Sequence, residues 1–415
     1  MFHLFRDYYT RIKGFSKNIR LFILAEIFIG IGMIFWFLLF NLYLQDGGYD
    51  KKSISDILLI SNIAAVIFAL PAGYFSGRYN HKMMLITSRI SATLFFLFAL
   101  STLDKMSLGS LMFLAFASAT FMGVVTGPFV MVNSARNERT YIFSINFIIN
   151  LGGGVIGNIL AGLIKEAIAS YGVPSVMAYR YTMMSGVALS AIGIIPLFFI
   201  KTGKTAESTD EPIKLSQIRN WKWGFFAKAV IPSTLIGVGA GLIVQFLNLY
   251  FKDMFNSSDS SIGFYMSWQS ITMALGVLIA PLIAEKLGKV NTIVLSELAS
   301  IPFMLVLALT KNLELAVFAF VVRASLMNMA IPISNAFILE LCKKEEQGIL
   351  NALYTMNWSI CWAFSAYLFG HIFKGNYPLT FFIAIGLYFA SSILFYIFFR
   401  KSEGKGEVCE VKPYI

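Results

Sequence analysis

The sequence predicts an all-α membrane protein with twelve transmembrane helices in two pseudo-symmetric six-helix bundles. Three observations support this prediction. The 415 residues are 57% hydrophobic and only 13% charged, with a mean hydropathy of +0.72, which is unlike a soluble globular domain. Apolar stretches of spanning length recur along the whole chain, and the second half of the chain repeats features of the first half.

The apolar stretches set the number of spans. A helix needs roughly 20 apolar residues to cross about 30 Å of hydrocarbon. Twelve stretches meet this requirement, at about 21–45, 53–76, 82–103, 107–133, 140–166, 178–200, 224–251, 260–284, 290–310, 313–341, 347–373 and 378–399.

The basic residues predict the orientation of these spans. Most of the 33 Lys and Arg residues fall on the side that holds the N-terminus, so both termini are expected in the cytoplasm, with the protein multi-pass in the cytoplasmic (inner) membrane. The polar stretch between the sixth and seventh spans is typical of a linker. The predicted parts are a cytoplasmic N-terminal segment (1–20), an N-terminal bundle (21–200), a cytoplasmic linker (201–222), a C-terminal bundle (223–400) and a cytoplasmic tail (401–415).

A shift of about 207 residues places the first half of the chain on the second. Gly30-x-Gly32 then matches Gly237-x-Gly239, and the Asn-Leu-Tyr of residues 41–43 matches that of residues 248–250. Asn150 falls on Asn357 at the same shift. Two copies of six spans are typical of a transporter whose bundles surround a central site.

The sequence offers little for other classes of function. The three cysteines and three histidines are scattered, and no nucleophile with a base, metal-ligand cluster or phosphate loop is evident. We therefore expect no enzyme activity, no cofactor and no metal. The net charge of +11 lies in short loops rather than on one face, so nucleic acid is not an expected partner.

Two loops resemble a signature of the major facilitator superfamily. That family carries roughly Gly-x-Leu-Ala-Asp-Arg-x-Gly-Arg-Lys between spans 2 and 3, often repeated between spans 8 and 9. The first loop here runs from Gly73 to Lys82 and has glycine in place of the acid, whereas the second runs from Pro281 to Lys289 and keeps it as Glu285. The gating residues that the resemblance implies are Arg78, Lys82, Glu285 and Lys289.

The resemblance also implies which spans surround the pathway. Spans 1, 4, 7 and 10 would line a central cavity, spans 2, 5, 8 and 11 would join the bundles, and spans 3, 6, 9 and 12 would support them from outside. The residues expected to bind substrate are Arg323, Asn328, Gln245, Asn248, Trp36, Asn41 and Trp358.

Five charges lie inside the apolar spans, where charge is costly and often functional. They are those of Glu26, Arg89, Lys228, Glu297 and Arg323. Arg323 in span 10 attracts an anionic group, or is the partner of a proton-carrying acid, or holds the bundle together through helix carbonyls and a neighbouring side chain. Glu26 in span 1 is the expected proton-coupling residue, with a static bridge to Lys228 as the alternative. Arg89 in span 3 and Glu297 in span 9 correspond under the duplication, and we expect both to be mainly structural.

Together these features predict a secondary active transporter that moves a small solute by alternating access, with proton coupling as an added expectation. Its partners would be a small-molecule substrate, protons and membrane lipids. Two alternatives stay open. A multidrug or lipid-like efflux pump would suit the 18 Met and 40 Phe residues, and a receptor or scaffold could keep the fold without transporting.

Overall fold

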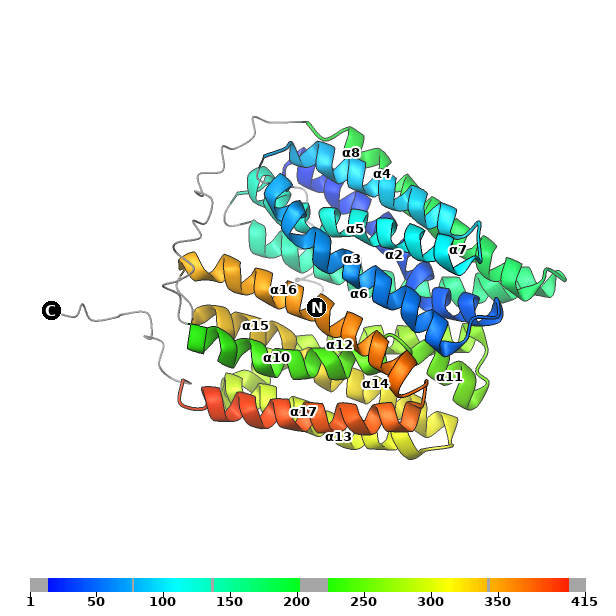
Figure 1. The fold of residues 1–415 in the computed structure, drawn as a ribbon. Helices are drawn as coiled ribbons and strands as arrows, with labels where there is room; N and C mark the ends of the chain where they lie inside the picture. The colour runs from blue at the N-terminus through cyan, green and yellow to red at the C-terminus, as the bar shows by residue number, and fades with distance from the viewer. Residues whose placement is uncertain (1–13, 77, 136–137, 202–222, 342–343, 403–415) are drawn as a thin grey trace. The chain divides into compact units, whose positions relative to one another are not determined.

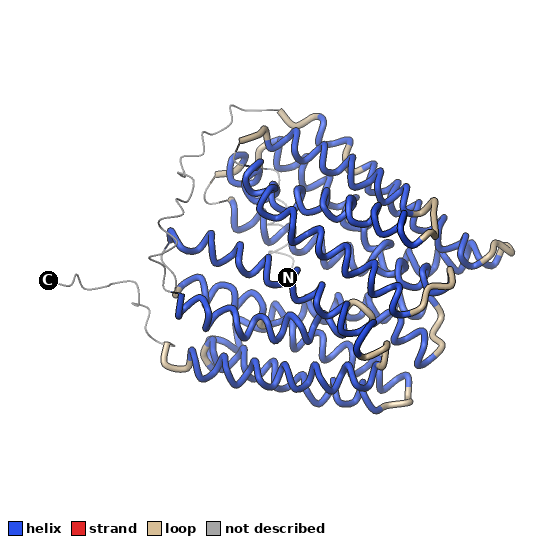
Figure 2. Tube along the Cα trace, in the orientation of Figure 1, coloured by secondary structure: helices blue, strands red, loops and turns tan. Residues whose placement is uncertain are grey.

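The structure is a computed structural model that describes residues 14–76, 78–135, 138–201, 223–341 and 344–402 (Figure 1). Most of the predicted N-terminal segment and linker, the tail from residue 403 and Gly77 of the first signature loop lie outside these residues. All regular structure within the described residues is helical (Figure 2).

The chain divides into two compact units, one formed by Met1–Gly48 with Ile60–Lys214 and one by Tyr49–Leu59 with Leu215–Ile415. The helices of the first unit, with α3 shared between the two, are α2 (Lys17–Asp46), α3 (Lys51–Ser76), α4 (His81–Ala99), α5 (Lys105–Asn133), α6 (Arg139–Ser170), α7 (Ser175–Ile192) and α8 (Ile195–Phe198).

The second unit holds the remaining helices. They are α10 (Trp223–Val244), α11 (Leu247–Phe255), α12 (Asp259–Leu287), α13 (Lys289–Leu309), α14 (Leu313–Met329), α15 (Ile331–Glu340), α16 (Lys344–Tyr367) with the π-helical turn η1 (Leu368–Ile372), and α17 (Tyr377–Phe399).

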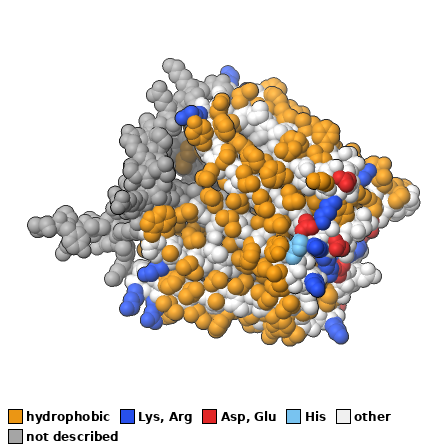
Figure 3. All heavy atoms as spheres, in the orientation of Figure 1, with side chains coloured by type: hydrophobic (Ala, Val, Ile, Leu, Met, Phe, Trp, Pro, Cys, Tyr) orange, Lys and Arg blue, Asp and Glu red, His pale blue; other side chains and the backbone are white. Residues whose placement is uncertain are grey.

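The described residues contain 11 helical segments that are long and apolar enough to cross a membrane. The predicted eleventh span, α16 with η1, is not among them, although it forms a helix of similar length. Hydrophobic side chains cover most of the visible surface, and charged ones gather towards its edges (Figure 3). This distribution is what a helix bundle in lipid requires.

Polar residues at the span ends fix where the helices begin. The side chains of Asp104, Asn312 and Asn376 accept the backbone N–H of the third residue of α5, α14 and α17, at 2.9 Å, 2.9 Å and 3.0 Å. Each thus satisfies a backbone donor that the helix leaves free. The Ser107 amide holds the pKa of Asp104 below its usual range.

Within each unit, corresponding helices pack in the same pairs. In the first unit α2 packs on α6 and α7, and α4 packs on α5; in the second, α10 packs on α16 and α17, and α13 packs on α14. Two predicted spans of the second unit are interrupted. Span 7 breaks at Gln245–Phe246, between α10 and α11, and span 10 breaks at Ala330, two residues before Pro332. Proline has no N–H to donate into the preceding turn, which explains the second break.

Candidate functional site

The second unit contains a cavity of about 630 Å³, a volume typical of small-molecule sites. Side chains of α10 and α12–α17 line it, and all of the lining residues belong to this one unit. Most of the lining is apolar, with a limited number of polar groups. The sequence-based assignment of spans 9 and 12 to an outer supporting role does not describe this cavity, because α13 and α17 line it too.

Arg323 provides the positive charge of the cavity. It lies in α14 with only 2% of its surface exposed, and its Nη2 donates to the Tyr388 hydroxyl at 2.7 Å. Its Cζ is also 5.7 Å from the centre of the Tyr388 ring. No ion pair joins it to an acid within the described residues, and its Nε has no hydrogen-bond partner there. A buried guanidinium with unused donor capacity attracts an acceptor or an anion.

Glu297 provides the negative charge of the same cavity. It lies in α13, is 7% exposed, and accepts a hydrogen bond from the Ser392 hydroxyl of α17 at 2.8 Å on Oε2. Ser392 and Tyr388 are one helical turn apart, so α17 contacts both Glu297 and Arg323. The two opposite charges are thus held by two neighbouring positions of one helix without pairing directly with each other.

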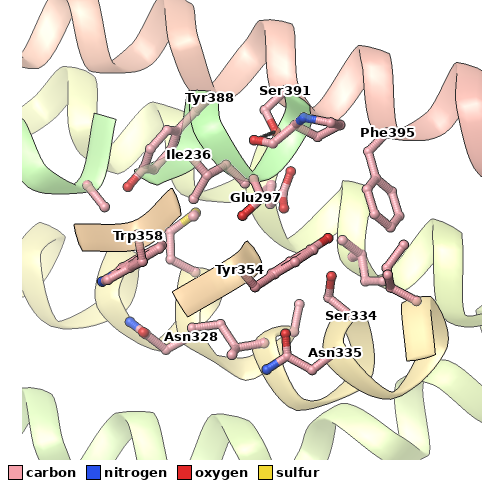
Figure 4. A pocket seen from close by; sticks show the side chains of 18 of the residues that line it. Ile236, Glu297, Asn328, Ser334, Asn335, Tyr354, Trp358, Tyr388, Ser391 and Phe395 are labelled. Atoms are coloured by element: carbon pink, nitrogen blue, oxygen red, sulfur yellow. Dashed lines mark hydrogen bonds between the residues drawn. The ribbon is translucent and has the colours of Figure 1, made fainter. Parts of the chain in front are cut away.

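Amides, hydroxyls and aromatic rings complete the lining. Tyr388, Ser391 and Phe395 project from α17 on one side, whereas Asn328, Ser334 and Asn335 come from α14 and α15 on the other, with Glu297 between them (Figure 4). Tyr354 and Trp358 of α16 supply flat faces. The arrangement suits a solute with a flat apolar body and a polar or anionic group.

The structure brings together only part of the residue set that the sequence predicts for substrate binding. Arg323, Asn328 and Trp358 line the cavity. Gln245 and Asn248 lie at or beyond the break in span 7, and neither lines this cavity. The Gln245 amide donates to the Gly241 and Trp362 carbonyls at 3.0 Å and 3.1 Å, and Asn248 accepts from the Leu249 amide at 2.9 Å. Both amides therefore satisfy backbone groups around the break.

Trp36 and Asn41 of the predicted set lie in α2 of the first unit. Trp36 is 3% exposed, and its ring centre is 4.6 Å from those of both Phe40 and Phe96. Asn41 is buried as well. Trp36 thus packs against aromatic rings of its own unit. The sequence could not indicate this, because the spacing of aromatic residues along a helix does not distinguish a packing role from contact with a ligand.

Glu26 and Arg89 form an ion pair within the first unit. The partner of Glu26 inside its own unit is therefore Arg89, whereas the alternative partner Lys228 belongs to the second unit, and a bridge to it stays a prediction. Arg89 thus has its ion-pair partner inside its own unit. Both side chains are largely buried, with 5% and 15% of the Arg89 and Glu26 side-chain surface exposed.

The four predicted gating residues have varied surroundings. The Arg78 guanidinium lies 4.3 Å from the centre of the Tyr74 ring, and the Lys82 Nζ donates to the Phe198 carbonyl at 2.8 Å. Lys289 pairs with Glu340 at 2.6 Å, whereas Glu285 is exposed. The ion pair at this end of the second unit thus uses the acid of α15 rather than the acid of the signature loop.

A cluster of polar side chains joins the start of α3 to the second unit. We call Lys51, Asp56, Asp253, His371 and Tyr377 the outer cluster, since the sequence predicts this end to be extracellular. The Lys51 Nζ is 2.9 Å from Asp253 Oδ2 and 4.2 Å from the Tyr377 ring centre, and the Tyr377 hydroxyl donates to Asp253 at 2.8 Å. Asp56 and His371 are 2.6 Å apart. These contacts explain why Tyr49–Leu59 groups with the second unit.

Replacing Lys51 by alanine should loosen this segment. We expect faster hydrogen–deuterium exchange of the amides of residues 49–59, because the substitution removes the ion pair and the contact with Tyr377. Replacing the neighbouring exposed Lys52 is the matched control and should leave exchange unchanged. Equal exchange in the two variants would contradict a docking role for the outer cluster.

Because Gly239 has no side chain, it leaves room for the Tyr388 ring beside it. A Cβ at Gly239 would lie 2.6 Å from Tyr388 Cε1, which is closer than real contacts allow. We expect Gly239→Ala to displace the ring from Arg323 and to cost about 1–3 kcal/mol of stability by overpacking. Gly386→Ala in α17 is the control, because its Cβ would meet open space, so it should gain about 0.5–1 kcal/mol. Melting temperatures of the two purified variants test this, and an equally stable Gly239→Ala would contradict it.

Sequence reasoning placed Glu297 in a structural role and did not single out Tyr388, Asn335 or Ser334. The signal that could have found Glu297 was its charge inside a span. For Tyr388, hydropathy patterns carry no signal, because a tyrosine in an apolar helix is unremarkable until its hydroxyl is seen beside a buried guanidinium.

Comparison with known proteins agrees with this architecture. A family model described as the Major Facilitator Superfamily matches residues 21–256 and 230–410. The Na(+), Li(+), K(+)/H(+) antiporter of Planococcus maritimus is 23% identical over 221 residues. That alignment covers 52% of this chain and 47% of the antiporter, so the chain matches about half the length of this relative.

Several solved structures are similar in fold. The nucleoside transporter NupG has a TM-score of 0.72 at 16% identity, covering 93% of this chain and 99% of that one. A POT family transporter in complex with a thioalcohol conjugated peptide has a TM-score of 0.73 at 12% identity, covering 94% and 99%. The D-xylose-proton symporter has a TM-score of 0.71 at 12% identity, covering 92% and 97%.

Proposed function

We propose that this chain, which belongs to the Major Facilitator Superfamily and is therefore a multi-pass membrane secondary transporter, moves a small organic anion by alternating access. The observation that carries this proposal is the cavity of the second unit with the buried Arg323 at its wall. The fold alone names no solute, because one fold serves many functions.

The chemistry of the cavity supports an anionic group on the solute. Arg323 already donates to the Tyr388 hydroxyl through Nη2, and a guanidinium has five donors in a planar fork. A carboxylate that approaches from the cavity can take two of the remaining donors, which is the geometry that arginine favours. An anion also supplies the charge that Arg323 lacks from any ion pair in the described part of the chain.

The apolar lining supports a flat body beside that anionic group. Trp358 and Trp362 of α16 have ring centres 5.9 Å apart, and both line the cavity with Tyr354. Aromatic walls with a few fixed polar groups are typical of small-molecule sites. Aromatic carboxylates are therefore the first solute class to test, and benzoate is the simplest member.

A second candidate is the exchange of a monovalent cation for protons, as named for the Planococcus maritimus relative. Glu297 and the hydroxyls of Ser334 and Ser391 offer oxygens in the cavity. The permanent charge of Arg323 in the same cavity disfavours a second cation there. We therefore prefer an organic anion over a monovalent cation as the transported solute.

A melting-temperature screen distinguishes the two candidates. Purified wild-type protein should melt at a higher temperature with aromatic carboxylates, because a ligand that binds the folded state stabilises it. It should not respond to Na⁺, Li⁺ or K⁺ beyond a matched ionic-strength control. Stabilisation by one of these cations and by none of the carboxylates would overturn the proposal in favour of cation exchange.

The predicted cytoplasmic position of both termini and the predicted proton coupling through Glu26 remain proposals. Glu26 pairs with the permanent charge of Arg89, whereas Glu297 accepts a hydrogen bond from Ser392 and has no ion-pair partner among the described residues.

A further inference from the structure

Two of the acids in spanning helices, Glu26 and Glu297, have different partners. Glu26 of α2 faces the guanidinium of Arg89. Glu297 of α13 accepts a single hydrogen bond, from the Ser392 hydroxyl, and no Lys, Arg or His forms an ion pair with it within the described residues. Because lipid and apolar side chains cannot solvate a carboxylate, a charge held by one neutral donor is costly.

The charged and titratable groups around Glu297 come from few elements. The helices that pack on α13 are chiefly α17, α14, α12 and α15. Among the residues that these helices and α16 add to the cavity lining, Arg323, Tyr388 and Tyr354 carry titratable groups. Arg323 donates to the Tyr388 hydroxyl, and Glu297 accepts from Ser392, which lies one helical turn from Tyr388. The charge balance of the cavity therefore depends on one arginine and one glutamate.

The charges of Arg323 and Glu297 explain why anion binding and proton binding would be linked. In the empty cavity the guanidinium and the carboxylate sum to zero. A bound anion on Arg323 brings the sum to one net negative charge, which a low-dielectric site resists. One proton from water on the carboxylate of Glu297 restores neutrality.

We propose that Glu297 is the proton-carrying residue of this transporter, and that it takes up its proton together with an anionic solute bound at Arg323. This inference rests on the proposed function. Proton and anion binding then favour each other, because linkage between two sites is reciprocal. The two ligands enter from one side of the membrane and leave on the other, which makes the protein a proton–anion symporter. Glu26 is the ion-pair partner of Arg89 in the first unit.

Infrared difference spectroscopy of the protein in lipid vesicles tests the proton site without any solute. As the pH falls from about 9 to about 6, exposed carboxylates with ordinary pKa values near 4 stay almost fully ionised. We expect the carbonyl band of a protonated carboxylic acid to appear in the wild type and in Glu26→Gln. The band should be missing in Glu297→Gln, which keeps the shape of the side chain and an acceptor for Ser392. A band that persists in Glu297→Gln, or that is lost in Glu26→Gln, would overturn the proposal.

Addition of benzoate at constant pH tests the linkage. We expect the same band to increase in the wild type, with no increase in Glu297→Gln or Arg323→Ala. A benzoate-induced increase that survives in Glu297→Gln would place the coupled proton elsewhere and overturn the proposal. If benzoate raises the melting temperature of the wild type yet leaves the band unchanged, the linkage fails while the proposed anion site stands. If no aromatic carboxylate raises the melting temperature, the proposed function fails first.

Discussion

Replacing Arg323 by alanine is expected to abolish solute binding and transport while the protein still folds. The substitution removes the charge and the donors that face the cavity, and losing one partner of a buried, charge-assisted contact costs about 2–5 kcal/mol. Since 1.4 kcal/mol corresponds to a factor of ten, the affinity for an aromatic carboxylate should fall at least about 30-fold. The affinity follows from the melting temperature as a function of benzoate concentration.

Arg323→Lys is the matched control for charge. It keeps one positive charge but loses the planar fork that can hold a carboxylate and the Tyr388 hydroxyl at once. We expect binding between that of the wild type and that of Arg323→Ala. If Arg323→Ala binds benzoate as tightly as the wild type, Arg323 has only the structural role that the sequence left open.

Replacing Arg89 by alanine is expected to destabilise the first unit strongly. The change leaves the Glu26 carboxylate without its ion-pair partner in a largely buried position, and breaking such a pair costs about 3–5 kcal/mol. Lys289→Ala is the control, because it breaks the exposed pair with Glu340 and should cost about 0–1 kcal/mol. Melting temperatures in the same detergent compare the two.

A double variant separates the pair from general packing. Replacing Glu26 and Arg89 together removes the unpaired charge, so the loss of stability should be smaller than the sum of the two single losses. Strictly additive losses, or an Arg89→Ala variant as stable as Lys289→Ala, would contradict the assignment of Glu26 and Arg89 as a buried structural pair.

Much of the fold follows from the sequence, because hydrocarbon imposes a length and an apolar composition on every span. The predicted spans correspond to the observed helices from α2 to α17, and the family predicted from the signature loops is confirmed by the match over residues 21–256 and 230–410. Cap residues such as Asn312 and Asn376 fix helix starts locally, so the starts of α14 and α17 can be predicted from the sequence.

The candidate site is harder to predict from the sequence. Helical periodicity shows which residues share one face of a span, but it does not show which other helix packs on that face. Arg323 can be identified from the sequence alone, because a charge within an apolar helix has a high free-energy cost whichever helix packs against it. Glu297 has the same cost, but its assignment to a supporting span hid its place beside Tyr388 of α17. Gln245 lies outside this cavity for a different reason: span 7 is interrupted there, and its amide donates to backbone carbonyls around the break. No residue pattern in the sequence indicates that break.

The most direct test of the account is whether the cavity around Arg323 opens to each side of the membrane in turn. Cys342, Cys361 and Cys409 are first replaced by alanine, and Ser334 of the cavity lining is then changed to cysteine in oriented membrane vesicles. We predict that a membrane-impermeant thiol reagent labels S334C from either side, that benzoate slows the labelling, and that the fully buried T182C stays unlabelled. Labelling of S334C from one side only, or from neither, would contradict alternating access to this cavity.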